Sequence, residues 1–237
     1  SIVNRYMSYL LGRGLVEPVD DLRSTNPATN EEMFTALAEY LEQNQYDVKK
    51  LVKVIMNSRV YQLSSQPTEL NQAAGKFYAF YKVKRIAAEP LLDAINTATA
   101  TTTKFQNLPA GTRAIELPDT NYPNYFLKTF GKPRRTSVCE CERAPDENLA
   151  QALHTLNGDT INAKIDDANG RLGKLITAEK SDAEIIRELF LATWSRTPTE
   201  EEIAVCKGIV GEAAERKEGL GDVLWALINA KEFIYVR

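Results

Sequence analysis

Hydrophobic residues recur at the spacing of amphipathic helices through the first third of the chain. Residues 2–11 are rich in apolar side chains and stop at a Gly-Arg-Gly run, which is typical of a helix end. Asn30 and Asp47 each precede an apolar stripe with gaps of three and four residues, so both are predicted N-caps. Residues 16–28 contain two prolines and predict a loop.

The last third of the chain shows the same helical spacing. Ser181 and Thr199 are each followed three residues later by a glutamate, which is the capping-box pattern, and an apolar helix follows each box. Residues 220–233 predict a final amphipathic helix. Apolar stripes of this kind ordinarily reflect core packing, so the chain is predicted to be all-α or nearly so, a mainly helical multi-helix bundle.

The middle of the chain is mixed. Residues 77–81 hold four aromatic side chains and predict an aromatic-rich helix, and a further helix is predicted from about Ala88, with Pro90 in its first turn. From about 99 to 145 the helical pattern fades among five prolines, and only 124–130 has a helical pattern. Apolar residues remain scattered along this stretch, so we expect a long, ordered, Pro-rich connection with at most one short strand pair.

A weak internal repeat links the two helical regions. Residues 51–61 resemble 223–233 in the spacing of their apolar residues and in an asparagine at the seventh position. A Gly-Arg pair at 12–13 precedes the first segment, and a Ser-Arg pair at 195–196 precedes the second. The repeat favours two related helical halves, although chance similarity between amphipathic helices produces the same pattern.

The chain length fits a single helical domain over residues 1–237. Because the sequence starts without Met and ends directly after an apolar pattern, we expect this domain to be cut from a larger protein. A finer division is an N-terminal helical half at 1–98, the long connection at 99–145 and a C-terminal helical half at 146–237.

The charge balance argues against two classes of partner. The chain carries 29 basic and 32 acidic residues, with a net charge of −3, so we expect no nucleic-acid partner, which usually selects a basic stripe. The longest apolar run, residues 223–228, is far shorter than the roughly 20 residues that span a bilayer. No membrane span is therefore expected in this segment.

Cys139, Cys141 and His154 form the most specific cluster of reactive side chains. Two thiols and an imidazole are suitable zinc ligands, yet a single residue between the cysteines is not the usual Cys-x-x-Cys spacing. The alternatives are buried free cysteines beside a hydrogen-bonded core histidine, a disulfide or redox pair, and a cysteine nucleophile assisted by the histidine. We expect His154 to be buried near the cysteine segment, with no metal as the default.

Charged residues next to apolar ones are a second group of candidates. Arginine and carboxylate side chains in such positions predict either interhelical ion pairs or a site for an anionic ligand. The candidate polar or anionic-ligand residues are Arg85, Glu89, Asp119, Arg134, Glu142 and Arg143, and the wider set includes Asp93 and Arg113.

No complete catalytic or cofactor motif accompanies these candidates. The sequence contains no Cys-x-x-Cys-His, so this segment binds no covalent haem, and we expect no cofactor as the default. The pair Gly12-x-Gly14 lacks a third glycine and a preceding strand, which excludes a dinucleotide fingerprint. Neither Gly-x-Ser-x-Gly nor His-Glu-x-x-His occurs.

Several motifs together carry a family resemblance. They are Gly12-Arg13-Gly14-Leu15-Val16, Arg85-Ile86-x-Ala88-Glu89, Cys139-Glu140-Cys141-Glu142-Arg143, Ser195-Arg196-x-Pro198-Thr199-x-x-Glu202 and Trp225-Ala226-Leu227-Ile228-Asn229. With these motifs the chain resembles the planctomycete-specific domain of unknown function that forms the C-terminal part of planctomycete cytochrome c-like proteins.

The resemblance implies a context rather than an activity. It implies a preceding domain, often a cytochrome c-like segment further upstream, and export to the periplasm or cell surface. Three functions follow as hypotheses. The leading one is a non-catalytic interaction or scaffold module whose partners are other domains of the same polypeptide. The alternatives are an enzyme domain acting on an extracellular substrate, such as a glycan, and a metal or redox module built on Cys139, Cys141 and His154.

Overall fold

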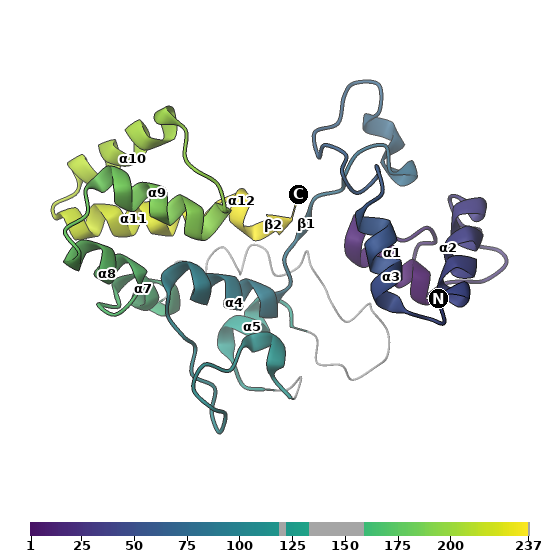
Figure 1. Cartoon of the computed structure of the whole chain (residues 1–237), viewed down its shortest axis with the longest axis horizontal. Coiled ribbons are helices and arrows are strands. Elements are labelled where there is room, and N and C mark those ends of the chain that lie inside the picture. The colour runs from purple at the N-terminus through teal and green to yellow at the C-terminus, as the bar shows by residue number, and fades with distance from the viewer. Residues whose placement is uncertain (119–121, 133–158, 237) are drawn as a thin grey trace. The chain divides into compact units, whose positions relative to one another are not determined.

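The computed structural model describes residues 1–118, 122–132 and 159–236, and these residues are mainly helical (Figure 1). The only strands among them are β1 (Lys84–Arg85) and β2 (Tyr235–Val236), which pair in a two-stranded sheet. The predicted all-α class is therefore confirmed. None of the described helices is both long and apolar enough to cross a bilayer.

The described residues form two compact units, with the division between Lys84 and Arg85. Each unit has its own hydrophobic core. The division falls before α4 (Ala88–Thr99), whereas the finer division considered from the sequence put residues up to 98 in the N-terminal half.

The first unit is a group of three mutually contacting helices, α1 (Ile2–Leu11), α2 (Glu31–Gln43) and α3 (Val48–Met56). The predicted N-caps are confirmed, since Asn30 accepts from the N–H of Met33 and Asp47 from the first N–H groups of α3. Helix α1 ends at Gly12, whose φ of 77° is left-handed as predicted for a glycine stop. The core residues are Val3, Met7, Leu11, Leu15, Leu41, Leu51, Ile55, Tyr78 and Tyr81.

The side chain of Asn4 stabilises the loop that follows α1 through hydrogen bonds to its backbone. This side chain is fully buried, and its amide nitrogen donates to the carbonyls of Val16 and Val19, both at 2.8 Å. Its amide oxygen accepts from the N–H of Val16 at 3.0 Å. A Cβ at Gly14 would lie 2.7 Å from this side chain, so the loop approaches Asn4 closely only because Gly14 has no side chain.

The predicted aromatic helix at 77–81 is wrong. A 3-10 helix, η1 (Gln72–Phe77), ends at the first residue of this segment, and Tyr78 is left-handed with φ 57°. Tyr78 and Tyr81 enter the core from a loop, and their hydroxyls donate to the carbonyls of Arg13 and Leu10. The cluster of four aromatic residues is compatible with helical spacing. The loop is favoured instead because it buries the rings of Tyr78 and Tyr81 while their hydroxyls keep hydrogen-bond partners.

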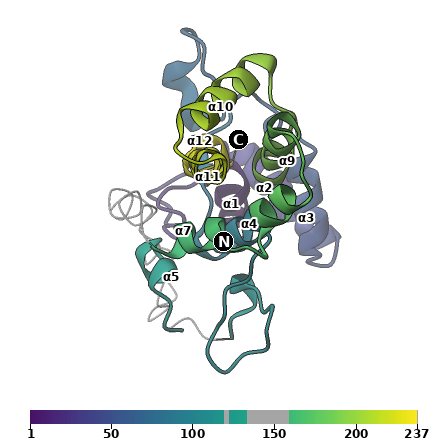
Figure 2. The same cartoon turned by 90° about the vertical axis from the view of Figure 1, so that its left-hand side faces the viewer.

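The second unit is built around α4, which contacts helices within the long connection and helices that follow it. The other helices that contact it are α5 (Tyr125–Thr129), α7 (Asp159–Asp166), α8 (Arg171–Thr177) and α9 (Asp182–Trp194). Helices α10 (Glu200–Glu212), α11 (Arg216–Asn229) and α12 (Lys231–Ile234) complete the unit, and α9, α10 and α11 lie together in both views (Figures 1 and 2). Both predicted capping boxes, at Ser181 and Thr199, are formed.

The described part of the long connection packs on this second core. Phe105, Phe126 and Phe130 are buried, and Asn124 caps α5, which lies within the helical pattern predicted at 124–130. Between α4 and residue 118 the backbone forms turns and one 3-10 helix, η2 (Ala114–Glu116), and no strand pair occurs within 99–118 or 122–132.

The final helix is interrupted. The sequence predicted one helix over 220–233, but α11 begins earlier, at Arg216, and ends at Asn229. Ala230 is extended, with φ −70° and ψ 149°, and the short α12 follows. Helical spacing continues across the break, so the pattern alone predicted no interruption.

The two segments of the internal repeat occupy corresponding places. Residues 51–61 begin in α3, which contacts α1 and α2, and 223–233 begin in α11, which contacts α9 and α10. In each group the first helix ends at a left-handed residue followed by arginine. Asn57 and Asn229 each donate to the carbonyl four residues earlier, at 2.9 and 2.8 Å. This shared order is the arrangement that an internal duplication predicts.

Candidate functional site

Of the six polar or anionic-ligand candidates, the structure describes Arg85 and Glu89, and it also describes Asp93 and Arg113 of the wider set. The predicted cysteine–histidine cluster lies outside the described residues, so the expected proximity of His154 to the two cysteines is not tested. The other four polar or anionic-ligand candidates also lie outside them. These undescribed residues are Cys139, Cys141, His154, Asp119, Arg134, Glu142 and Arg143. Across 1–118, 122–132 and 159–236, no three histidine, cysteine or acidic side chains gather where they could hold a metal ion.

Arg85 and Glu89 lie where the chain enters α4. Arg85 Nη2 donates to the backbone carbonyl of Phe130 at 2.9 Å, and its guanidinium carbon lies 5.9 Å from the centroid of the Phe130 ring. Glu89 is in the first turn of α4, where a carboxylate interacts favourably with the helix dipole. Arg85 thus holds the end of α5 against the start of α4.

An open pocket of about 210 Å³ lies at the C-terminal end of α4. We call it the α4 pocket, and its lining residues are Asp93, Asn96, Thr97, Thr101, Thr102, Thr103, Gly111, Thr112 and Arg113. The buried Asp93 accepts from the backbone N–H groups of Ala114 and Ile115, at 2.7 and 3.2 Å. Asp93 Oδ2 lies 3.6 Å from Nε of Arg113, whose side chain is 62% exposed. The pocket therefore combines a carboxylate whose charge is offset by two backbone N–H groups with an accessible guanidinium.

A glycine turn positions Arg113 at the rim of the pocket. Thr112 donates its N–H and its hydroxyl to the carbonyl of Pro109, at 3.2 and 2.8 Å, and Gly111 has φ 86°. We expect Gly111→Ala to lower the free energy of unfolding by about 1 kcal/mol, because L-residues rarely adopt this φ even where space is open. Gly208→Ala on α10 is the control, since a Cβ there is equally free of contacts but lies in a helix.

The control should raise the free energy of unfolding by roughly 0.5–1 kcal/mol, because alanine is the better helix former. Urea unfolding of both variants measures the two effects. A loss of equal size in the two variants would contradict the backbone explanation for Gly111.

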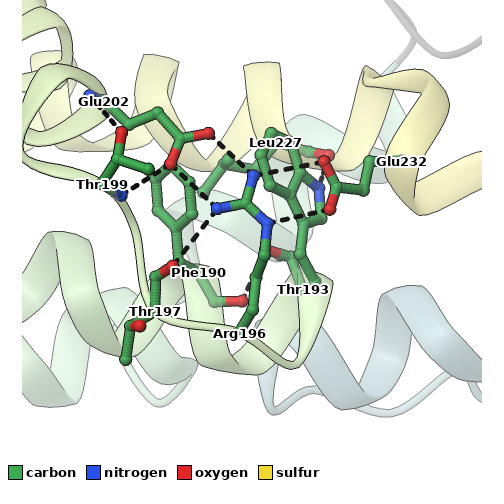
Figure 3. Close-up of polar contacts among 9 residues, drawn as sticks. Phe190, Thr193, Arg196, Thr197, Thr199, Glu202, Leu227 and Glu232 are labelled. Carbon is green, nitrogen blue, oxygen red and sulfur yellow. Dashed lines mark hydrogen bonds and ion pairs between the residues drawn. The ribbon is translucent and has the colours of Figure 1, made fainter.

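Arg196 joins three helices through its guanidinium (Figure 3). Its Nη1 and Nη2 donate to Glu202 at 2.9 and 2.7 Å, while Nε and Nη2 donate to Glu232 at 2.9 and 3.2 Å. The guanidinium carbon also lies 4.9 Å from the ring centroid of Trp194. We call Arg196, Glu202 and Glu232 the Arg196 clamp. It ties the end of α9 to the start of α10 and to α12.

The carboxylate of Glu202 in the clamp is not poised for proton transfer. The side-chain hydrogen bond from Arg196, followed by a backbone hydrogen bond from Thr199, lowers the pKa of Glu202 to about 2. A carboxyl group with such a pKa stays ionised at neutral pH and is a poor general acid or base. The nearby thiol of Cys206 is buried, and burial raises its pKa, so it remains protonated. We therefore assign the clamp a structural role, in which it stabilises the packing of α9, α10 and α12.

Helix α3 presents a different kind of surface. Lys49, Lys50 and Lys53 are exposed, and none forms an ion pair within the described residues. At 100° per residue they occupy the middle of the exposed side, and Met56 and Val54 lie at its two edges. These apolar side chains are 42% and 37% exposed. We call the five residues the α3 cationic face.

The charges of the first unit are segregated along the sequence. Residues 14–47 hold eight acidic residues and one arginine, whereas 48–84 hold seven basic residues and one glutamate. The near-neutral total charge conceals this separation. The α3 cationic face is thus part of a segment with almost no acidic residues of its own.

Comparison with known families assigns the chain. The model of the PSD1 family, described as a protein of unknown function (DUF1553), matches residues 1–210. The chain belongs to the PSD1 family. Neither the curated proteins nor the solved structures contain a match to it.

The PSD1 match spans the α3 cationic face, the α4 pocket and the first two residues of the Arg196 clamp, up to Val210 in α10. Sequence reasoning selected Asp93 and Arg113 separately, but it did not pair them, because they belong to different elements twenty residues apart. It missed the α3 cationic face altogether. Three lysines in a nine-residue helix without an acidic residue were the available signal.

Proposed function

We propose that this PSD1 chain is a non-catalytic interaction module, and that the α3 cationic face binds an acidic surface elsewhere in the same polypeptide. The proposal includes the context drawn from the family resemblance. In that context, residues 1–237 belong to a larger, exported, cytochrome-associated protein, and the other domains of that protein are the partners.

The observation that carries the proposal is the combination of charge and apolar exposure on α3. Three lysines with no ion pair among the described residues attract carboxylates at long range, and this attraction speeds and orients association. Val54 and Met56 beside them can lose water on contact, which adds an apolar contribution to the electrostatic one. Methionine adapts readily to an opposing surface.

Helix α3 is also held rigidly enough to act as a docking element. Leu51 and Ile55 anchor it in the first core, and the side chain of Asp47 accepts from the N–H groups of Lys49 and Lys50 at 2.9 and 3.3 Å. A surface on a fixed helix loses little conformational freedom on binding except in its lysine side chains. Charge complementarity selects an acidic partner surface.

Two alternatives from the sequence remain distinct proposals. An enzyme acting on an extracellular substrate, such as a glycan, draws its support from the α4 pocket, which is polar and open. A metal or redox module rests on Cys139, Cys141 and His154. That module would make the melting temperature sensitive to a chelator and the three residues interdependent.

The proposal is tested by the reactivity of single lysines in the intact natural protein. Brief treatment with acetic anhydride, followed by mass spectrometry, gives an acetylation rate for each lysine. We expect Lys49, Lys50 and Lys53 to react several-fold more slowly than Lys207, an exposed lysine on α10. In residues 1–237 alone, all four should react at similar rates. Equal rates for the α3 lysines in both samples would overturn the proposal.

A further inference from the structure

The α4 pocket has a lining that the interaction role does not use. Its lining includes five threonines, one asparagine and Arg113, and no aromatic residue. Its volume of about 210 Å³ is below the usual range for drug-sized ligands, so it suits a small and strongly polar molecule.

The carbonyl groups at the end of α4 are already occupied. Arg171 donates from Nε to the carbonyl of Ala98 at 2.7 Å and from Nη2 to that of Thr97 at 3.1 Å. The N–H of Thr101 donates to the carbonyl of Asn96 at 3.0 Å. Two of these carbonyls therefore accept from a cationic side chain, which also pairs with Glu188 at 3.1 Å, and this lessens the partial negative charge of the helix end.

The one acidic group of the pocket is likewise compensated. Asp93 receives two backbone N–H groups from η2 and lies beside Arg113. Arg113 contacts Asp93 through Nε at 3.6 Å and is largely exposed, so its guanidinium, which has five N–H donors, is accessible to a ligand. A guanidinium of this kind can bind a carboxylate with two parallel hydrogen bonds.

The other polar groups supply donors suited to hydroxyl groups. The amide oxygen of Asn96 accepts from the hydroxyl of Thr103 at 3.0 Å, which leaves its NH₂ group for a ligand. Thr102 is exposed, and no hydrogen bond of its hydroxyl occurs within the described part of the chain. Lys164 does not line the pocket, but its Nζ donates to the hydroxyl of Thr101 and to the carbonyl of Thr102, both at 3.3 Å, and so places a second cation next to two lining residues.

We propose that the α4 pocket binds a small carboxylate that also carries hydroxyl groups, that is, a monosaccharide-sized sugar acid. Arg113 binds the carboxylate, and Asn96 and Thr102 bind the hydroxyls. The pocket lies wholly within the second unit and the α3 cationic face within the first, so this inference does not depend on the proposed interaction role.

Titration calorimetry with glucuronate, and with glucose as the uncharged match, tests the inference. We expect saturable binding of glucuronate at millimolar concentrations, and weaker or no binding of glucose. Arg113→Gln should weaken glucuronate binding by about tenfold or more, because a charged hydrogen-bond donor is lost. Thr102→Val should weaken it less. Arg187→Gln, an exposed arginine on α9, is the matched control and should leave it unchanged.

Thermal melts of each variant without ligand establish that the variants are folded. Three results would each overturn the inference: no glucuronate binding by the folded wild type, equal affinity for glucose and glucuronate, and equal effects of the two arginine variants. None of these results bears on the acetylation rates of the α3 lysines, so the two proposals can fail separately.

Discussion

Asn4→Ala should destabilise the first unit by about 3 kcal/mol, because it leaves buried backbone groups without partners. The side chain of Asn4 makes three hydrogen bonds to the loop after α1, and its exposed fraction is 0%. Alanine removes the donors to Val16 and Val19 and the acceptor for the N–H of Val16. Each unpaired group costs about 1–3 kcal/mol, and water entering the site limits the total.

The measurement for Asn4 must report on the first unit. Both tryptophans, Trp194 and Trp225, lie in the second unit, so hydrogen exchange of the α1 amides is the suitable observable. Asn57→Ala is the matched control, because Asn57 also donates to a carbonyl, at 2.9 Å, but is exposed. A control effect as large as that of Asn4→Ala would contradict the role given to burial.

Arg196→Met should lower the free energy of unfolding by about 2 kcal/mol, through the loss of four hydrogen bonds and the contact with Trp194. The expected loss is limited because the three side chains of the Arg196 clamp are 27–36% exposed, and solvent screens such pairs. Arg196→Lys should recover only part of the loss, since an ammonium cannot form the same planar set of bonds. Urea unfolding followed by tryptophan fluorescence measures both.

The clamp also predicts a change in acid stability. The pKa of Glu202 is about 2 in the folded chain, below its ordinary value of 4.5. Its ionised form therefore adds stability above pH 4.5, and this part is lost as the pH falls toward 2. We expect wild-type stability to fall across this window and Arg196→Met to show a shallower fall. Parallel curves for the two proteins would contradict the assignment.

The local signals in the sequence predicted the helices well where capping chemistry decided their ends. Asn30, Asp47, Ser181 and Thr199 begin helices because their side chains accept from the first free N–H groups, and this requires only neighbouring residues. The glycine at position 12 ends α1 for an equally local reason, its left-handed φ.

Features that depend on distant partners were not predictable in this way. The loop at 77–81 is fixed by tyrosine hydroxyls that bond to carbonyls more than sixty residues earlier. The break at Ala230 separates α11 from α12, and Glu232 beyond it meets Arg196 across thirty-six residues. Both outcomes depend on tertiary packing, which overrides local helical spacing.

In the candidate site too, local features were predictable from the sequence and tertiary contacts were not. The charged character of Asp93 and Arg113 was evident from the sequence, but their closeness arises because η2 turns its N–H groups onto α4. The α3 cationic face needed only the count of lysines in one helix, together with the burial of Leu51 and Ile55 that fixes which side is exposed.

Zero-length crosslinking of the intact natural protein tests the central claim most directly. Carbodiimide joins a lysine to a carboxylate only when the two side chains touch. The account predicts links from Lys49, Lys50 or Lys53 to aspartate or glutamate outside residues 1–237, and a smaller yield at high salt. Lys207 on α10 should form few such links. Links from the α3 lysines that are no more frequent than those from Lys207 would contradict the account.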